Sequence, residues 1–291
     1  MFKVLEKREI APNTHELVIE APRIAAKVQP GQFVILMVDA ASERVPYTLA
    51  DWDPARGTIT IVVLEVGQSS RKLALLHRGD AVLHVVGPLG MPIPVERVGT
   101  VVLAGGCYGI GGILGIARRM RAAGNRVVAM VEARSHYVHY YRRELTDAAD
   151  ELICTTIDGS LGVQGHAVDA LAERIAKGEK PELVVAVGCP FMMMLIGRET
   201  QPHGIRTLVA LNPIMLDGTG MCGACRVTVG NKTRFACVDG PFFDAHQVDW
   251  EELWDRRAAY DQDETESLER TDPVDGPPDR GQAEHACRCG G

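Results

Sequence analysis

The sequence lacks a long apolar run. None reaches the 18 or more residues that a membrane-spanning helix needs, so we expect no membrane partner. The first nine residues mix apolar with charged side chains, and we therefore expect no secretory signal and a cytoplasmic location. In that compartment the eight cysteines are not expected to form structural disulfides. Metal binding, redox chemistry and simple burial are the roles left for them.

An excess of positive charge is missing as well. Residues 1–250 carry 26 acidic and 26 basic side chains, whereas residues 251–291 carry twelve acidic and five basic ones, which accounts for the net charge of −7. A nucleic-acid-binding domain presents a basic face, so no nucleic-acid partner is expected. We expect the acidic tail, 251–291, to be disordered from about Tyr260. Its end holds three potential metal ligands, which we expect to be solvated: His285, Cys287 and Cys289.

A chain of 291 residues is typically long enough for about two domains, and the pattern of apolar residues changes near Val101. Before that point, short β-prone runs between Pro and Gly residues predict an antiparallel barrel or sandwich over residues 1–97. The runs are 16–20, 32–38, 58–64 and 81–86. Afterwards, apolar strands alternate with helices, which predicts a doubly wound α/β domain over residues 98–207. These strands are 101–104, 127–131, 152–156 and 183–187, with helices to about 123 and near 168–176.

A cysteine-containing loop follows in a small module, 208–250, that opens with a possible strand at 208–211. The plant-type [2Fe–2S] ligand run is C-x4-C-x2-C…C, and the chain fits it if Asp217 takes the first position. The remaining ligands would then be Cys222, Cys225 and Cys237. A zinc site with three Cys and one Asp would use the same donors. Zinc ligands usually come as two short pairs and this loop has one, so the spacing favours iron–sulfur.

A glycine-rich turn, 105–112, connects the first α/β strand to a helix. Backbone N–H groups at such a turn hold the pyrophosphate of a dinucleotide. The turn does not match G-x-G-x-x-G, so its position between strand and helix carries the prediction, and a merely tight turn is the alternative. The residues predicted to line the dinucleotide site are Gly105, Gly106, Gly109 and Gly111.

The ends of the following strands should face the same crevice. Glu132 can bond a ribose 2′-hydroxyl and Arg134 a 2′-phosphate, so both NAD(H) and NADP(H) stay open. Cys189 is predicted to contact the nicotinamide ring, with a buried inert thiol as the alternative. Further crevice residues are expected at two later strand ends: Asp158, Gly159, Gly188 and Pro190.

Two polar clusters and a glycine stand out in the β-rich part. An Arg beside hydroxyls and glycines suits a phosphate, and a Tyr can cover a planar ring. Ordinary turn chemistry is the alternative for each of them. The residues are Arg44, Pro46, Tyr47 and Thr48 in the first cluster, Gly67, Ser69 and Ser70 in the second, and Gly87 near the end of the domain.

Taken together, the three parts resemble the ferredoxin–NADP reductase superfamily, and within it the electron-transfer subunit of dihydroorotate dehydrogenase and its relatives. The resemblance covers residues 1–250. Asp217 in place of the first cluster Cys, and the segment 43–51, are similar to the small subunit of NADH-dependent ferredoxin:NADP oxidoreductases. The superfamily pattern is Arg-x-Tyr-Ser/Thr, and here Arg44 stands one residue earlier.

The resemblance implies an FAD-binding barrel, an NAD(P)-binding domain and a [2Fe–2S] module. It implies that Thr48 bonds the flavin near its reactive nitrogen and that Tyr47 lies against the isoalloxazine or ribityl portion. Arg44 would serve the FAD pyrophosphate with help from the second cluster. The nicotinamide would lie over Cys189 and its neighbours Gly188 and Pro190.

The expected function is an electron relay from NAD(P)H through FAD and the cluster to a larger flavin and iron–sulfur subunit, with ferredoxin as a further candidate partner. By resemblance, the complex would couple NADH and ferredoxin to NADPH through flavin-based bifurcation. One alternative is the dihydroorotate dehydrogenase electron-transfer subunit, which is expected to have four Cys ligands, so Asp217 argues against it. The other is a zinc-stabilised dinucleotide-binding regulator without turnover.

Overall fold

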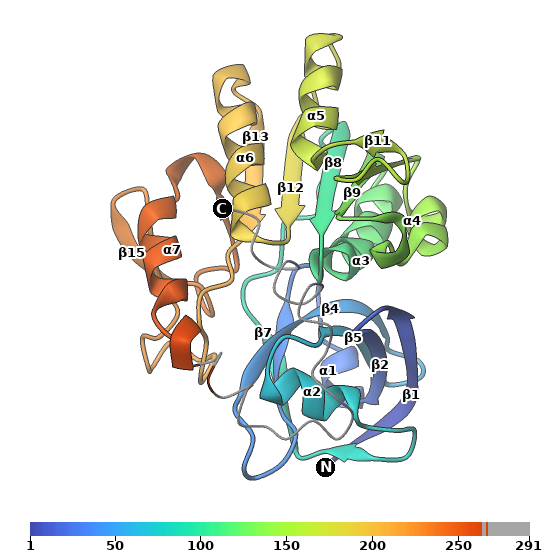
Figure 1. Ribbon diagram of the computed structural model, residues 1–291, viewed down its shortest axis with the longest axis vertical. Coiled ribbons are helices and arrows are strands. Elements are labelled where there is room, and N and C mark those ends of the chain that lie inside the picture. Colours follow the sequence, from blue (N-terminus) through green and yellow to red (C-terminus); the bar gives the residue numbers. More distant parts are fainter. Residues whose placement is uncertain (264–265, 267–291) are drawn as a thin grey trace.

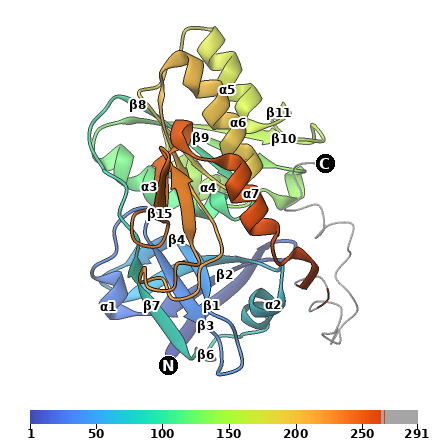
Figure 2. The same ribbon diagram turned by 90° about the vertical axis from the view of Figure 1, so that its left-hand side faces the viewer.

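The computed structural model describes residues 1–263 and 266. Figure 1 shows a β-barrel below, an α/β domain above it, and a small C-terminal module alongside. Turning the molecule shows the module lying across the junction of the other two parts (Figure 2). Within the described residues, no helix combines the length and apolar character needed to cross a membrane.

The first part is a near-closed antiparallel barrel of seven strands in the order β6-β1-β2-β5-β4-β3-β7. Alternating buried and exposed side chains give these strands an apolar inner face, which includes Leu17, Ile59 and Ile61. Helix α1 is Pro22–Ala25 and helix α2 is Gln68–Ala74. The strands are β1 (Phe2–Ala11), β2 (Thr14–Glu20), β3 (Phe33–Met37), β4 (Val45–Asp53), β5 (Thr58–Leu64), β6 (Ala81–Val82) and β7 (His84–Leu89).

The second part is a mainly parallel sheet in the order β11-β10-β9-β8-β12-β13-β16. Its central strands are buried on both faces, as covered parallel strands are. The strands are β8 (Thr100–Gly106), β9 (Arg126–Ala133), β10 (Glu151–Thr156), β11 (Val163–Gln164), β12 (Leu183–Val187), β13 (Arg206–Ala210) and the antiparallel β16 (Phe242–Asp244). The helices are α3 (Gly109–Ala122), α4 (Arg142–Ala148), α5 (Ala167–Ala176) and α6 (Pro190–Thr200), with short 3₁₀ turns at His136–Val138 and Gln201–His203.

The third part contains the hairpin β14 (Arg226–Val229) and β15 (Lys232–Phe235), a 3₁₀ turn at Ala245–Gln247, and helix α7 (Trp250–Ala258). The predicted boundary at residue 208 runs through β13, and β16 returns to pair with that strand. The module therefore shares the edge of the α/β sheet.

The acidic tail is not disordered from its start. Helix α7 forms because the Asp249 side chain accepts the Glu252 N–H at its first turn and Leu253 is buried. Arg256 also donates to the Ala224 carbonyl at 3.0 Å, which fixes the helix to the module. Residues 261–263 are helical too. The predicted solvated ligands lie outside the described residues: His285, Cys287 and Cys289.

The other predicted elements hold with small changes at their ends. Strands 58–64 and 183–187 have the predicted bounds, and the helix after the glycine-rich turn ends at Ala122, one residue before its predicted end. The run 81–86 is split, because β6 pairs with β1 while β7 pairs with β3. That break lets one segment serve both ends of the barrel sheet.

Helix α3 brings the barrel and the α/β domain together through glycines. A Cβ on Gly111 would lie 2.8 Å from Val62, and one on Gly115 would lie 2.8 Å from Trp52. Around this contact Arg118 pairs with Asp51, and the Arg119 guanidinium lies 5.3 Å from the centre of the Trp52 ring. The absence of side chains on this face of α3 allows close approach to β4 and β5.

Candidate functional site

The crevice of the α/β sheet opens between β8 and β12, where the strand order reverses direction. Gly105 is in register with Val187, so the glycine-rich turn and Gly188 lie side by side. A Cβ on Gly109 would meet the Val187 carbonyl oxygen at 1.8 Å, and one on Gly188 would meet the Gly106 carbonyl oxygen at 3.0 Å. The glycines predicted from two distant segments therefore lie together, with their backbones closely packed at the ends of β8 and β12.

A tyrosine closes part of this turn. The Tyr140 hydroxyl donates to the Cys107 carbonyl at 2.8 Å and accepts the Gly111 N–H at 3.0 Å. Cys107 itself has a left-handed φ of 52°, which a residue other than glycine rarely adopts. Because the Gly111 N–H already donates to the Tyr140 hydroxyl, it is not available to bind a pyrophosphate. The role of Gly111 is instead to allow α3 to pack closely against Val62 of the barrel.

The strand-end acid has a structural role. Glu132 is 7% exposed, and its carboxylate accepts the Ala167 N–H at 2.7 Å and contacts His166 Nδ1 at 3.2 Å. It therefore caps α5, and this geometry does not leave it facing a ribose. The hydrogen bond that the His166 ring donates to the Glu132 carboxylate raises the pKa of His166 above its ordinary value. Arg134, at the end of β9, is exposed.

The neighbouring loop is built around an acid. The Asp158 carboxylate accepts the Ser160 N–H at 2.9 Å and the Ser160 hydroxyl at 2.6 Å. These bonds lower its pKa to about 2, with the Ser160 hydroxyl as the largest cause. Ser135 Oγ, after β9, lies 3.2 Å from Ser160 Oγ, so the two strand ends are tied together. Gly159 has the left-handed φ of 71° that this turn requires.

Cys189 lies at the crevice floor but is 4% exposed. Its sulfur accepts the Met192 N–H at 3.5 Å, which makes it the N-cap of α6, and Pro190 is the first residue of that helix. This is what the inert-thiol alternative expects, and contact with a nicotinamide stays a prediction.

On β4, Tyr47 lies in the buried core of the barrel, whereas Thr48 lies at the junction with α3. The Tyr47 hydroxyl is buried and has no hydrogen-bond partner among the described residues, and burial raises its pKa well above the ordinary value. A Cβ on Gly112 would lie 3.2 Å from Thr48 Cγ2, so Thr48 lies directly beside the helix that leaves the glycine-rich turn.

The rest of the predicted flavin set divides into two groups. The loop before β4 is joined to α2 by Lys72, which bonds Asp39 at 3.1 Å and the Ser42 hydroxyl at 3.1 Å, and Arg44 is exposed on that loop. Of the remaining predicted residues, Pro46 is in β4, Gly67 is the N-cap of α2, and Ser69 and Ser70 are buried in the first turn of α2. The Ser70 hydroxyl is engaged locally, because it accepts the Gly67 N–H at 2.9 Å.

Gly87 has a packing role in β7. A Cβ there would lie 2.7 Å from Val34 Cγ1, so the absence of a side chain allows β7 to pack beside β3. This contact accounts for the glycine without a cofactor.

The loop after residue 216 brings the four predicted metal ligands together as two pairs. The Asp217 carboxylate accepts two hydrogen bonds from Cys222, one from its backbone N–H at 2.9 Å and one from its thiol. Cys225 is a free thiol whose sulfur accepts the Cys237 N–H at 3.4 Å, and the side chains of the two cysteines are hydrogen-bonded to each other. Among the described residues, no three His, Cys, Asp or Glu side chains converge as on a single ion. Two pairs suit a binuclear centre, which places two ligands on each iron, better than one zinc ion.

Charge and burial distinguish the two pairs. Backbone bonds from Thr219 and Cys222 keep the pKa of Asp217 below its ordinary value, so it is a carboxylate. Burial raises the pKa of Cys237 to about 12, and a bound cation would reverse this by favouring the thiolate. Cys225 and Cys237 are 2% and 1% exposed, whereas Cys222 is exposed. The Asp217–Cys222 pair is therefore the outer one.

Comparison with known proteins places the chain. A family model for the iron–sulfur cluster binding domain of dihydroorotate dehydrogenase B matches residues 212–249. A protein of Thermotoga maritima, named as an electron transfer subunit homolog of dihydroorotate dehydrogenase B (NAD(+)), is 40% identical over 268 residues, which cover 92% of this chain and 94% of the relative. The chain belongs to the family of dihydroorotate dehydrogenase B electron transfer subunits and their homologs.

Two further similarities agree. The dihydroorotate dehydrogenase B electron transfer subunit of Enterococcus faecalis is 28% identical and covers 85% of this chain and 97% of its own. In the structure of an NADH-dependent reduced ferredoxin–NADP oxidoreductase, studied for flavin-based electron bifurcation, one chain matches with a TM-score of 0.88 and 39% identity, over 93% of this chain and 97% of that one. These matches confirm the predicted class, an electron-transfer oxidoreductase subunit that functions in a complex.

The cofactors typical of this electron-transfer subunit family are FAD, a [2Fe–2S] cluster and a nicotinamide dinucleotide. The residues of this chain fit each of them. The unpartnered Tyr47 hydroxyl and the open space at Gly67, where a Cβ would meet nothing within 4 Å, fit a flavin nucleotide. The glycine-rich turn at the end of β8, beside the end of β12, fits a dinucleotide, and the paired ligands fit a binuclear cluster.

Sequence reasoning missed Tyr140, Tyr141, Tyr108 and Asn212. Tyr108 donates to the Gly188 carbonyl at 2.7 Å and accepts a hydrogen bond from Asn212, which lies at the start of the cluster segment. The chain has only six Tyr, so an adjacent pair beside a nucleotide domain was the available signal.

Proposed function

We propose that this electron-transfer subunit passes electrons between a nicotinamide dinucleotide, FAD and a [2Fe–2S] cluster to a larger flavin and iron–sulfur subunit, within a bifurcating NADH/ferredoxin:NADP oxidoreductase. The observation that carries the proposal is the carboxylate of Asp217, paired with Cys222 in the first ligand position of a plant-type run. Similarity to a chain of such an oxidoreductase, at a TM-score of 0.88, supports it.

The residues divide the task between the domains. When bound, FAD would accept a hydride and the cluster would carry single electrons. Tyr47 and Thr48 of β4 hold the flavin, with Thr48 beside α3, and Arg44 serves its pyrophosphate. Glycines 105, 106 and 109 hold the dinucleotide, while Arg134 is the strand-end group placed to read its ribose. The predicted cytoplasmic location stays a prediction.

The surface around the outer ligand pair is where we place the larger subunit. Leu216, Met221 and Val238 are 52%, 88% and 39% exposed beside the exposed Cys222. Exposed apolar side chains grouped in this way mark protein interfaces. Met221→Glu should therefore weaken co-purification of the larger subunit. Val163→Glu, at the opposite edge of the α/β sheet and also 39% exposed, is the matched control and should have no effect.

The second candidate is the dihydroorotate dehydrogenase electron-transfer role, which the names of the relatives favour. The third is the zinc-stabilised regulator, which the absence of three converging ligands in the described part disfavours.

One experiment separates the three functions. The chain is purified anaerobically with its bound partner, and the complex is assayed with NADPH, NAD⁺ and oxidised ferredoxin, and separately with dihydroorotate and NAD⁺. The proposal expects reduction of ferredoxin only when NAD⁺ is present, because bifurcation couples the two acceptors. Dihydroorotate-dependent NADH formation would support the second role instead, and stoichiometric zinc without flavin would support the regulator.

A further inference from the structure

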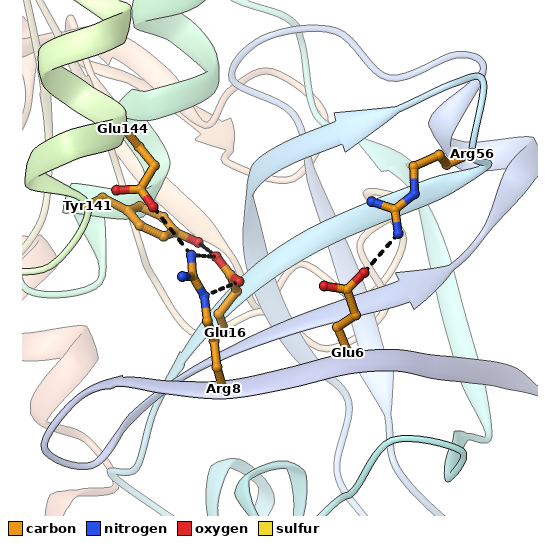
Figure 3. Close-up of polar contacts among 6 residues, drawn as sticks. All are labelled: Glu6, Arg8, Glu16, Arg56, Tyr141 and Glu144. Carbon is orange, nitrogen blue, oxygen red and sulfur yellow. Dashed lines mark hydrogen bonds and ion pairs between the residues drawn. The ribbon is translucent and has the colours of Figure 1, made fainter.

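A polar network crosses from the barrel to the α/β domain at the β1–β2 hairpin. Arg8 on β1 and Glu16 on β2 stand directly opposite each other, so their side chains lie on one face of the barrel. Arg8 Nε donates to Glu16 Oε1 at 2.6 Å and Arg8 Nη2 to Glu16 Oε2 at 3.1 Å (Figure 3). This bidentate pair fixes the position of the Glu16 carboxylate.

The α/β domain contacts the same carboxylate. The Tyr141 hydroxyl donates to Glu16 Oε2, and Arg8 Nη2 also reaches Glu144 Oε1 on α4 at 3.3 Å (Figure 3). The Glu16 side chain is only 13% exposed and Tyr141 only 6%. Burial, together with the Glu16 charge, raises the pKa of Tyr141, so its hydroxyl stays protonated and able to donate.

Tyr141 is adjacent to the tyrosine that holds the glycine-rich turn. The rings of Tyr140 and Tyr141 pack edge to face, 5.1 Å apart, and the Tyr140 hydroxyl bonds both Cys107 and Gly111. Tyr141 has a left-handed φ of 57°, a conformation that the surrounding contacts must maintain. Consecutive residues thus connect the turn on one side and the barrel on the other.

We propose that Arg8, Glu16, Tyr140 and Tyr141 form a tyrosine strap that sets the orientation of the dinucleotide turn against the flavin barrel. The contact between α3 and β4 supplies one attachment between the domains, and the strap supplies a second, at α4. The strap therefore adds, at α4, a further restraint on rotation about the contact between α3 and β4. The inference rests on the proposed function, because orientation matters most for hydride transfer, where a displacement of about 1 Å can cost about a hundredfold in rate.

The test uses the full chain with two single variants, Tyr141→Phe and Glu16→Gln. Glu6→Gln is the control, because Glu6 is on β1, as Arg8 is, and pairs with Arg56 at 2.8 Å entirely within the barrel (Figure 3). Hydrogen–deuterium exchange without nucleotide reports the strap itself. Anaerobic stopped-flow reduction of the flavin by NADH or NADPH then gives the hydride-transfer rate and the nucleotide Kd separately.

Both strap variants should exchange faster over residues 140–148, and hydride transfer should slow by about tenfold while Kd changes by less than about twofold. The control should change neither. The double variant should be no slower than the worse single one, because both changes break the same connection. If one variant folds poorly, the other carries the same test.

Unchanged exchange and an unchanged transfer rate in a well-folded variant would overturn the strap. Equal slowing in the Glu6→Gln control would do so too, since the effect would then be general. A wild-type flavin that neither nicotinamide reduces would instead refute the proposed function, while the exchange measurement would still decide on the strap.

Discussion

The Gly109→Ala substitution tests how the dinucleotide crevice is built. The added Cβ would lie 1.8 Å from the Val187 carbonyl oxygen, 2.3 Å from the Val187 carbonyl carbon and 2.8 Å from the Gly188 nitrogen. All three atoms are backbone, so no side chain can rotate away. Gly109 is the first residue of α3, and its backbone is not left-handed, so alanine meets no conformational penalty there.

The magnitude follows from this contact. Restoring an ordinary separation requires α3 to move away from β12 by about 1.6 Å, and overpacking of this kind costs about 1–3 kcal/mol. Because the clash is with backbone, we expect the upper part of that range. The better helix propensity of alanine returns at most about 1 kcal/mol. The net loss of about 2 kcal/mol should lower the melting temperature of this 291-residue chain by roughly 3–4 °C.

Calorimetry and nucleotide titration check this prediction. Gly109→Ala should melt earlier and bind the nicotinamide dinucleotide at least about tenfold more weakly, because the turn moves with the helix. Gly178→Ala is the control, since Gly178 has a left-handed φ of 86° but open space around it, and it should cost about 1 kcal/mol without affecting binding. Wild-type melting and affinity in Gly109→Ala would refute the packing argument.

Three further predictions concern the cluster and one buried pair. Cys225→Ala should abolish the cluster signal yet leave flavin reduction by the nicotinamide intact, whereas Cys154→Ala, outside the loop, should change neither. Asp217→Cys should keep a cluster with a shifted potential, and an Asp217→Ala protein with unchanged iron content and EPR spectrum would exclude the carboxylate as a ligand. Because its pKa is raised in the fold, protonated His166 stabilises the protein fully below about pH 6.5, and this stabilisation is lost as the pH rises through the folded-state value. Urea unfolding should therefore show the deficit of His166→Gln shrinking from about pH 6 to about pH 8, and a deficit that grows would contradict it.

The regular part of the fold was accessible from the sequence because its signals are local. The strands Leu183–Val187 and Thr58–Leu64 could be predicted because their own runs of apolar residues indicate burial. Helix α3 could be predicted because its apolar residues repeat at helical spacing. Helix α6 was not predicted, because its Met-rich start is apolar on every side and gives no periodicity. Helix α7 was missed because its stability depends on one buried leucine, Leu253, in an otherwise charged segment.

The candidate site shows the same difference between features that local sequence predicts and features that depend on distant contacts. Ligand spacing predicted the Asp217 loop, since all four positions lie within one short segment. Glu132 shows what the sequence could not predict. Its position at a strand end can be inferred from the sequence, but the hydrogen bond that its carboxylate accepts from the Ala167 N–H cannot. Tyr140 and Tyr141 act on partners that are far away in the chain, and only the fold brings them together.

The most direct test of the central claim is the EPR spectrum of anaerobically isolated protein after reduction by NADH or NADPH. Electron transfer from the crevice through the flavin to the paired ligands predicts an S = 1/2 signal of a reduced [2Fe–2S] cluster, with about two irons and two acid-labile sulfides per chain. Flavin bleaching with no such signal, or zinc in place of iron, would contradict the account.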